Sequence, residues 1–157
     1  MSHEDFIAHP KGSIPTGSFC KSCMRYNSRY SVVDALIMRD EKILLMKRAT
    51  NPKKGWWAFS GGFIDWDETL EQACVREVKE EVGLVSKSVK LFGVYSSPSR
   101  DSDGSQKISH CYIVETEGEV SIDPSEVIEV QWFYLDNLPS DIAFDHRQMI
   151  EDYKKTL

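Results

Sequence analysis

Three glutamates, Glu77, Glu80 and Glu81, stand three and four residues apart within residues 62–84, a segment with helical spacing. Like charges at these spacings share one face of a helix and repel each other, and no cation is expected to neutralise the three. Clustered carboxylate oxygens are the ligands that hard divalent cations prefer. The trio therefore predicts a site for Mg²⁺, with Mn²⁺ as the alternative ion. The competing interpretation is a solvated acidic helix face.

A divalent cation at such a site suits hydrolysis of a diphosphate linkage. The oxygens of a diphosphate repel an incoming nucleophile. A bound metal ion neutralises these oxygens, orients the substrate and makes bound water more acidic. Attack of metal-activated water on phosphorus is therefore one chemistry compatible with such a helix.

The spacing around the trio resembles the signature of the Nudix hydrolases. Gly62 is followed after five residues by Glu68, and after seven more by residues 76–84, Arg-Glu-Val-Lys-Glu-Glu-Val-Gly-Leu. Every signature position is filled, and so long a pattern is far more specific than a lone glycine motif. The resemblance implies an α/β fold, an α/β/α sandwich with a mixed sheet, whose catalytic helix follows a Gly-Gly turn.

The resemblance also implies roles for individual residues. Glu77 and Glu81 are the expected metal ligands, followed by Glu80, and a backbone carbonyl at Gly61 is implied as a further ligand. Arg76 and Glu68 are expected to pair and to hold the glutamates in place. The alternative for these two residues is an exposed ion pair of little energetic weight.

The base that activates water is less defined, because Nudix enzymes differ in this residue. A carboxylate in the loop before the last strand often contributes. Glu126, six residues before Trp132, is the candidate at the comparable place, and Asp123 and Glu129 compete with it. Any one of them is also compatible with a solvated surface charge.

Residues 93–104 resemble the ADP-ribose pyrophosphatase branch, with Pro98 fifteen residues beyond Gly83 and followed by Arg100 and Asp101. The resemblance implies that ADP-ribose is split into AMP and ribose 5-phosphate. Asp67 and the pair 102–103 depart from the branch pattern, and the second departure removes a basic residue from the substrate loop. Nucleoside triphosphates, sugar nucleotides and NADH remain alternative substrates, and a catalytically silent nucleotide sensor is the alternative outside enzymes.

Further substrate contacts are expected from basic and aromatic residues near the glycine turn. Arg48 is suited to donate hydrogen bonds to phosphates. Trp57 and Phe63 are candidates for stacking on a nucleobase. Aromatic residues at strand positions are also common in protein cores, and packing is the alternative for both.

Charge is unevenly distributed along the 157 residues, whose net charge is −6. Residues 1–64 hold ten Lys and Arg against five Asp and Glu, whereas residues 65–83 hold seven acids against two bases. This distribution suits a small anionic nucleotide held by cations and basic residues together. A nucleic-acid partner usually needs a broad basic surface, so none is expected.

The chain is long enough for one domain, predicted over residues 30–157. Residues 1–29 form an expected arm whose Cys20 and Cys23 are half of a zinc-ribbon pattern without a second half. No apolar run has the length of a membrane span and no signal-peptide layout is present, so a cytoplasmic location without a membrane partner is expected. Dimers are frequent in the ADP-ribose pyrophosphatase branch, so the resemblance is compatible with a homodimer.

The elements around the site follow from periodicity. Residues 30–38 and 42–48 predict a hairpin, and a short strand over residues 56–59 leads into Gly61 and Gly62. Leu70, Cys74, Val78 and Val82 repeat every fourth residue, which predicts a helix that is capped by Asp67 or Thr69 and ends at Gly83.

The second half of the chain predicts strands over residues 89–95, 108–115 and 129–134, and a closing helix over residues 145–155. Strands and helices in this order indicate a mixed sheet covered on both faces. His146, in Phe-Asp-His-Arg, resembles a recurring feature of the closing helix in the family, and a structural role at the helix entry is expected for it.

Overall fold

The computed structural model describes residues 19–20, 24–26, 28–102 and 104–157. In chain order its elements are β1 Phe19–Cys20, β2 Arg25–Tyr26, β3 Ser31–Arg39, β4 Lys42–Arg48, β5 Trp57–Ala58, β6 Ser60–Phe63, α1 Leu70–Val82, β7 Val85–Tyr95, β8 Ile108–Glu117, β9 Val127–Tyr134 and α2 His146–Lys154. Most of the predicted arm, including Cys23, falls outside the described residues. Among the described residues, no helix has the length and apolar character needed to cross a membrane.

The main sheet is mixed, as predicted. Its strand order is β5-β4-β3-β8-β7, with β6 also paired to β3 and β9 to β4. β3 and β8 run parallel, whereas the other pairs within this sheet are antiparallel. β1 and β2 pair with each other in a separate small sheet. The predicted hairpin over residues 30–48 is confirmed as β3 and β4.

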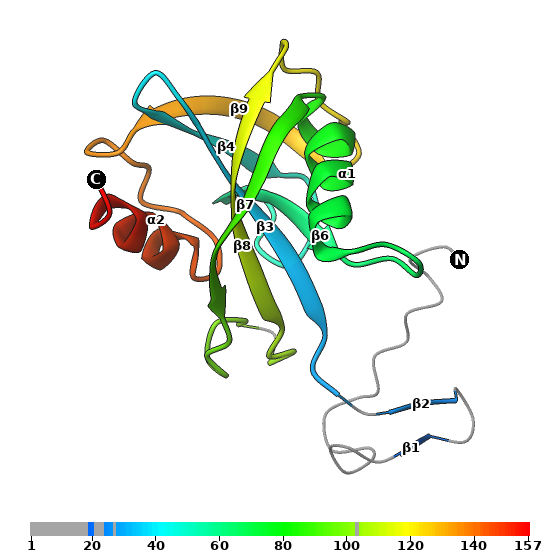
Figure 1. Ribbon diagram of the computed structural model, residues 1–157. Coiled ribbons are helices and arrows are strands. Elements are labelled where there is room, and N and C mark those ends of the chain that lie inside the picture. The colour runs from blue at the N-terminus through cyan, green and yellow to red at the C-terminus, as the bar shows by residue number, and fades with distance from the viewer. Residues whose placement is uncertain (1–18, 21–23, 27, 103) are drawn as a thin grey trace.

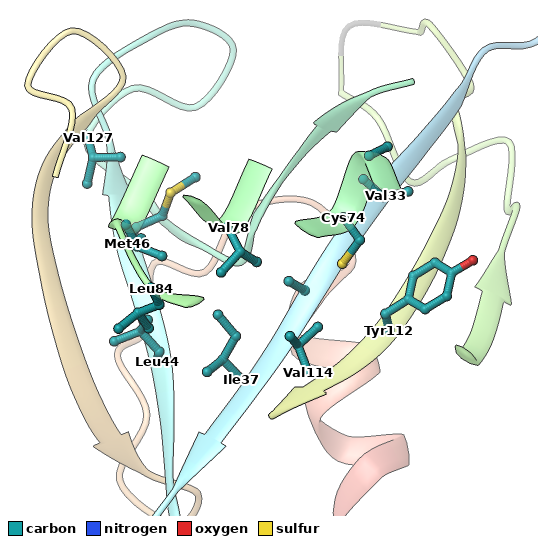
Figure 2. Close-up of a cluster of buried hydrophobic side chains, with 13 residues drawn as sticks. Val33, Ile37, Leu44, Met46, Cys74, Val78, Leu84, Tyr112, Val114 and Val127 are labelled. Carbon is teal, nitrogen blue, oxygen red and sulfur yellow. The ribbon is translucent and has the colours of Figure 1, made fainter. Parts of the chain in front are cut away.

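Both faces of the sheet are buried, because the strands at its centre carry apolar side chains in both directions. Figure 1 shows α1 and α2 on opposite sides of the sheet. Side chains from one face, such as Val33 and Ile37, pack with Val78 of α1 in the cluster that Figure 2 shows. Leu36 and Leu45 point to the other face and pack with Met149 of α2. The α/β/α sandwich is therefore confirmed.

Helix α1 begins and ends where the sequence predicts. Thr69 caps it: the Gln72 N–H donates to Thr69 Oγ1 at 3.2 Å, and the Thr69 N–H donates to Gln72 Oε1 at 2.8 Å. Gly83 ends the helix in the left-handed conformation with φ of 74°. Of the two predicted caps, Thr69 is confirmed and Asp67 is wrong. The apolar face is buried as predicted, and Glu77 and Glu81 are buried beside it.

Candidate active site

A cavity of about 470 Å³ opens beside strand β6 and α1. This volume falls within the range of small-molecule sites. Its ionisable lining consists of Asp34, Arg48, Glu77, Glu81, Arg100, Asp101, Lys107, Glu126 and His146. The structure thus brings most of the predicted site residues together, and Gly61 and Phe63 line the same cavity. Trp57, Glu68, Arg76, Glu80 and Pro98 are not part of its lining.

Glu81 is buried at the wall of the cavity, with 4% of its surface exposed. Its Oε2 accepts hydrogen bonds from Ser60 Oγ at 2.7 Å and from the Gly61 N–H at 2.9 Å. Burial raises the pKa of Glu81 to about 8, and the nearby Glu77 carboxylate adds to the rise, although the two hydrogen bonds oppose it. The ionised form of Glu81 is therefore disfavoured in the metal-free protein.

Glu77 lies against Gly62 of strand β6. A Cβ atom on Gly62 would come within 2.5 Å of Glu77 Oε1, so only glycine leaves room for the carboxylate. Burial is also the main cause that raises the pKa of Glu77, while a hydrogen bond from Arg76 opposes the shift. The tight turn predicted at Gly61 and Gly62 is wrong, because both residues lie within β6 and pair with β3. The two glycines instead permit close approach between strand β6 and helix α1.

Arg76 pairs with three glutamates. Its Nη2 and Nε donate to the two oxygens of Glu68 at 2.7 and 3.1 Å, which is the pairing that the resemblance implies. Its Nη1 also contacts Glu77 Oε1 at 2.8 Å and Glu80 Oε2 at 3.1 Å. The expectation that no cation neutralises the glutamates is therefore wrong, because Arg76 adjoins Glu77 and lies one turn before Glu80.

Glu80 differs from the other two glutamates. Its side chain is 58% exposed and pairs with Arg76. Within the described residues, no three carboxylate, imidazole or thiol groups converge on one point that would enclose a metal ion. Mg²⁺ is commonly held by one or two carboxylates, with waters and substrate phosphates completing its shell. Glu77 and Glu81 fit such a site, since both are buried carboxylates with raised pKa values at one cavity.

Of the three candidate bases, Asp123 and Glu126 lie in the loop before β9 and Glu129 lies in β9 itself, and only Glu126 lines the cavity. Asp123 accepts hydrogen bonds from the N–H and Oγ of Ser125 and is exposed, and Glu129 pairs with Lys47 at 3.0 Å. The structure thus places Glu126 with the two buried glutamates and directs its competitors elsewhere.

This loop is fastened to the end of α1. The Ser121 N–H donates to the Val82 carbonyl at 2.9 Å, and the Asp123 N–H donates to the Glu81 carbonyl at 3.3 Å. A Cβ atom on Gly83 would meet Ser121 at 2.7 Å, so the loop packs directly on the helix stop. Glu126 therefore belongs to a segment bonded to the same helix that carries Glu77 and Glu81.

Arg48 offers donors to the cavity. Its Nε donates to the Pro52 carbonyl at 2.9 Å, and its guanidinium lies 5.2 Å from the ring centre of Phe144. Its two terminal nitrogens make no hydrogen bond or ion pair with the residues that the structure describes. Such a guanidinium suits the recognition of a phosphate.

Arg100 and Asp101 line the cavity but are engaged by the protein itself. The Arg100 side chain is 2% exposed and donates to both oxygens of Asp145, at 3.0 and 2.8 Å. It also lies 3.4 Å from Asp101 and 3.5 Å from Asp34. Asp101 accepts the Lys107 N–H at 2.7 Å. This arrangement favours the holding of the loop over direct contact with a substrate.

Two other predicted contacts lie away from the cavity. Trp57 is 6% exposed and packs edge-on against Phe133 with ring centres 4.9 Å apart, as the packing alternative expects. Pro98 is exposed in the loop between β7 and β8. Phe63 remains the predicted aromatic residue at the cavity.

Sequence reasoning missed Asp34, which is 7% exposed at the cavity. Ser109 donates to it, and His146 Nε2 lies 3.2 Å from its Oδ1. Burial acts to raise the pKa of Asp34, but His146, Arg100 and Ser109 outweigh burial and lower the pKa to about 2. A single carboxylate within the apolar run of β3 was the available signal, since buried charges need partners.

Comparisons with known proteins agree with this geometry. Residues 29–153 match the model of the NUDIX domain. The chain is 47% identical over 123 residues to an ADP-ribose pyrophosphatase of Methanocaldococcus jannaschii, covering 78% of this chain and 72% of the relative. It is 30% identical over 138 residues to the NAD-capped RNA hydrolase NudC of Salmonella paratyphi C, covering 85% of this chain but only 52% of that longer relative.

A solved structure is also similar over nearly the whole chain. The NUDIX domain of Shewanella oneidensis NrtR, complexed with ADP ribose, superposes with a TM-score of 0.72 at 28% identity and covers 99% of both chains. The filled signature, the sandwich fold and the match over residues 29–153 lead to one conclusion: the chain belongs to the Nudix hydrolase family.

Proposed function

We propose that the protein is a Mg²⁺-dependent pyrophosphohydrolase that cleaves ADP-ribose into AMP and ribose 5-phosphate. The observation that carries this proposal is the cavity itself, in which Glu77, Glu81 and Glu126 meet Arg48, whose terminal nitrogens have no hydrogen-bond partner among the described residues. Carboxylates for a cation and a donor for phosphate oxygens are the two requirements of diphosphate hydrolysis.

Each residue has a distinct task in this proposal. Glu77 and Glu81 hold the cation, which when bound neutralises phosphate oxygens and acidifies water. Arg48 donates hydrogen bonds to the diphosphate. Glu126 accepts the proton of the attacking water. Arg76 keeps Glu77 oriented through its bonds to Glu77 and Glu68, which is an indirect role.

Two comparisons support ADP-ribose as the substrate. The Methanocaldococcus relative is an ADP-ribose pyrophosphatase, and the Shewanella domain is complexed with ADP ribose. The volume of the cavity suits a small nucleotide. The departure at residues 102–103 follows Arg100 and Asp101 in the sequence and lies outside the signature helix, so it bears on substrate preference and leaves the carboxylates of α1 in place.

NAD-type dinucleotides are a second candidate substrate class. The Salmonella relative is an NAD-capped RNA hydrolase. The diphosphate linkage of NAD presents the same reaction centre as that of ADP-ribose. A silent nucleotide sensor is less well supported, because Glu77 and Glu81 are both present and both line the cavity.

A substrate panel tests the proposal. The purified protein is incubated with Mg²⁺ or Mn²⁺ and with ADP-ribose, NADH, nucleoside triphosphates or dinucleoside polyphosphates, and phosphate-containing products are separated and quantified. We expect kcat/KM to be highest for ADP-ribose, with AMP and ribose 5-phosphate as products. Higher turnover of NADH would select the second candidate, and no turnover of any diphosphate would contradict hydrolysis altogether.

A further inference from the structure

His146 begins α2 and is 2% exposed, between a strand and a buried carboxylate. Its Nδ1 accepts a hydrogen bond of 3.0 Å from the Phe59 N–H, and its ring stacks on that of Phe59 with centres 4.6 Å apart. Its Nε2 lies 3.2 Å from Asp34 Oδ1, in an electrostatic contact that is not aligned as a hydrogen bond. Because Nδ1 accepts, the ring proton is on Nε2 and faces Asp34.

Phe59, which His146 holds, lies between β5 and β6 and leads directly into the carboxylate site. Phe59 is followed by Ser60 and Gly61, and these two residues supply both hydrogen bonds to Glu81 Oε2. A shift of the backbone at Phe59 would therefore be transmitted within one or two residues to the donors that orient Glu81.

Asp34 holds the same segment from β3. Asp34 is the ladder partner of Gly61, and a Cβ atom on Gly61 would lie 3.0 Å from Asp34 Oδ1. The Ser60–Gly61 backbone is thus confined between β3 on one side and Glu81 on the other, and His146 contacts the confining residue Asp34 as well as Phe59.

From this geometry we infer that His146 is a positioning residue for the carboxylate site. It accepts the Phe59 N–H and so fixes the Ser60–Gly61 segment, which in turn fixes Glu81. The inference rests on the proposed function only where it assigns metal binding to Glu81. It goes beyond a structural role at the helix entry, because it predicts a local effect on Glu81 that general destabilisation does not produce.

Three variants separate these roles. His146→Leu removes the acceptor, whereas His146→Asn places an amide oxygen near the position of Nδ1 and can accept the same N–H. Met149→Ala is the matched control, because Met149 is fully buried on the same helix but packs in the core away from the cavity.

The first measurement uses the metal-free protein. Amide hydrogen exchange is followed at Gly61 and, as a core reference, at Leu45. We expect His146→Leu to accelerate exchange at Gly61 by a larger factor than at Leu45, His146→Asn to restore protection, and Met149→Ala to show no excess at Gly61. Equal acceleration at both amides in His146→Leu would overturn the inference.

The second measurement is Mn²⁺ affinity by calorimetry without substrate. Residues that orient metal ligands typically change affinity or activity about 10–100-fold when mutated, and we expect a loss in this range for His146→Leu. His146→Asn should recover most of the affinity and Met149→Ala should keep it. Unchanged affinity in His146→Leu would also overturn the inference. If the unmutated protein binds no Mn²⁺, the proposed function fails, while hydrogen exchange still decides the role of His146.

Discussion

Two carboxylates at the cavity, Glu81 and Asp34, have opposite electrostatic environments. Asp34 has His146, Arg100 and Ser109 beside it, and its pKa falls to about 2. For Glu81, burial and the nearby Glu77 outweigh two hydrogen bonds, and its pKa rises to about 8 although Arg48 interacts with it electrostatically. Asp34 is thus compensated by the protein itself, whereas the charge of ionised Glu81 is compensated only in part, and a bound cation would complete the compensation.

The raised pKa of Glu81 predicts a pH-dependent stability of the metal-free protein. Between the ordinary value of 4.5 and about 8, folded Glu81 holds a proton that the unfolded chain has released. The free energy of unfolding should therefore fall as pH rises through this range. Glu81→Gln should remove this contribution and flatten the slope, as measured by urea unfolding from pH 5 to 8.

The same variant tests catalysis. Glu81→Gln should lower kcat by more than the roughly 100-fold upper range typical of residues that act through a ligand. Mn²⁺ should stabilise the unmutated protein at pH 8, since a ligand that binds only the folded state raises its stability, and should not stabilise the variant. Unreduced turnover in Glu81→Gln would move the metal site elsewhere.

Glu126 and Glu129 form a natural pair for testing the base, because they lie three residues apart in the chain and only Glu126 lines the cavity. Glu126→Gln should lower kcat about 10²–10⁴-fold, the usual contribution of a general base, with little effect on KM. Glu129→Gln loses only the exposed contact with Lys47 and should retain activity. Similar activities of the two variants at each pH would argue against Glu126 as the base.

The resemblance to the Nudix signature predicted the candidate site residues, and helical periodicity accounts only for the side that the glutamates of α1 share. It did not predict the tasks of Arg100 or Trp57, which depend on what the fold brings next to them. Arg100 meets Asp145, which lies 45 residues further along the chain, and Trp57 meets Phe133. Such contacts leave no local pattern in the sequence.

At the scale of elements, the contact between strand β6 and helix α1 shapes the site. Gly62→Ala would place Cβ 2.5 Å from Glu77 Oε1, and the buried carboxylate has little room to withdraw. We expect kcat to fall about 100-fold, as a misplacement near 1 Å can cause, with the fold retained by circular dichroism.

Gly93→Ala is the matched control for this substitution. Gly93 lies in strand β7, and its added Cβ would meet only the ring of Tyr95 at 3.3 Å. The side chain of Tyr95 can adjust by a few tenths of an ångström. Activity close to that of the unmutated protein is expected, and a loss equal to that of Gly62→Ala would show that any glycine substitution in the sheet is harmful.

The elements themselves differ in how well the sequence predicts them. Helix α1 was predicted closely because Thr69, its apolar face and Gly83 mark both ends. Strand β7 begins at Val85, four residues before the predicted start. It lies at an edge of the sheet. Polar side chains face solvent there, so the alternation of apolar and polar residues that indicates a strand is less clear in the sequence.

At the scale of the whole molecule, the Arg100 cluster ties together three distant parts of the chain. Arg100 contacts Asp34 in β3, Asp101 in its own loop and Asp145 at the start of α2. Arg100→Met would leave these buried carboxylates without their shared cation, and we expect a loss of about 3–5 kcal/mol in the free energy of unfolding.

The exposed pair Lys87 and Glu117 provides the comparison. Both side chains are more than half exposed, at 54% and 57%, and lie 2.9 Å apart. Lys87→Met should therefore change the free energy of unfolding by less than about 1 kcal/mol. Urea unfolding of both variants measures the difference, and comparable losses would refute a special role for the Arg100 cluster.

The fastening of the Glu126 loop to the end of α1 has a consequence for how this protein can diversify. Ser121 and Asp123 bond the loop to the helix, so Glu77, Glu81 and Glu126 belong to one connected structural unit. Residues 97–102, in contrast, are anchored by Arg100 to Asp145 at the start of α2. A change in residues 97–102 that keeps Arg100 can therefore leave the bonds between the Glu126 loop and α1 intact.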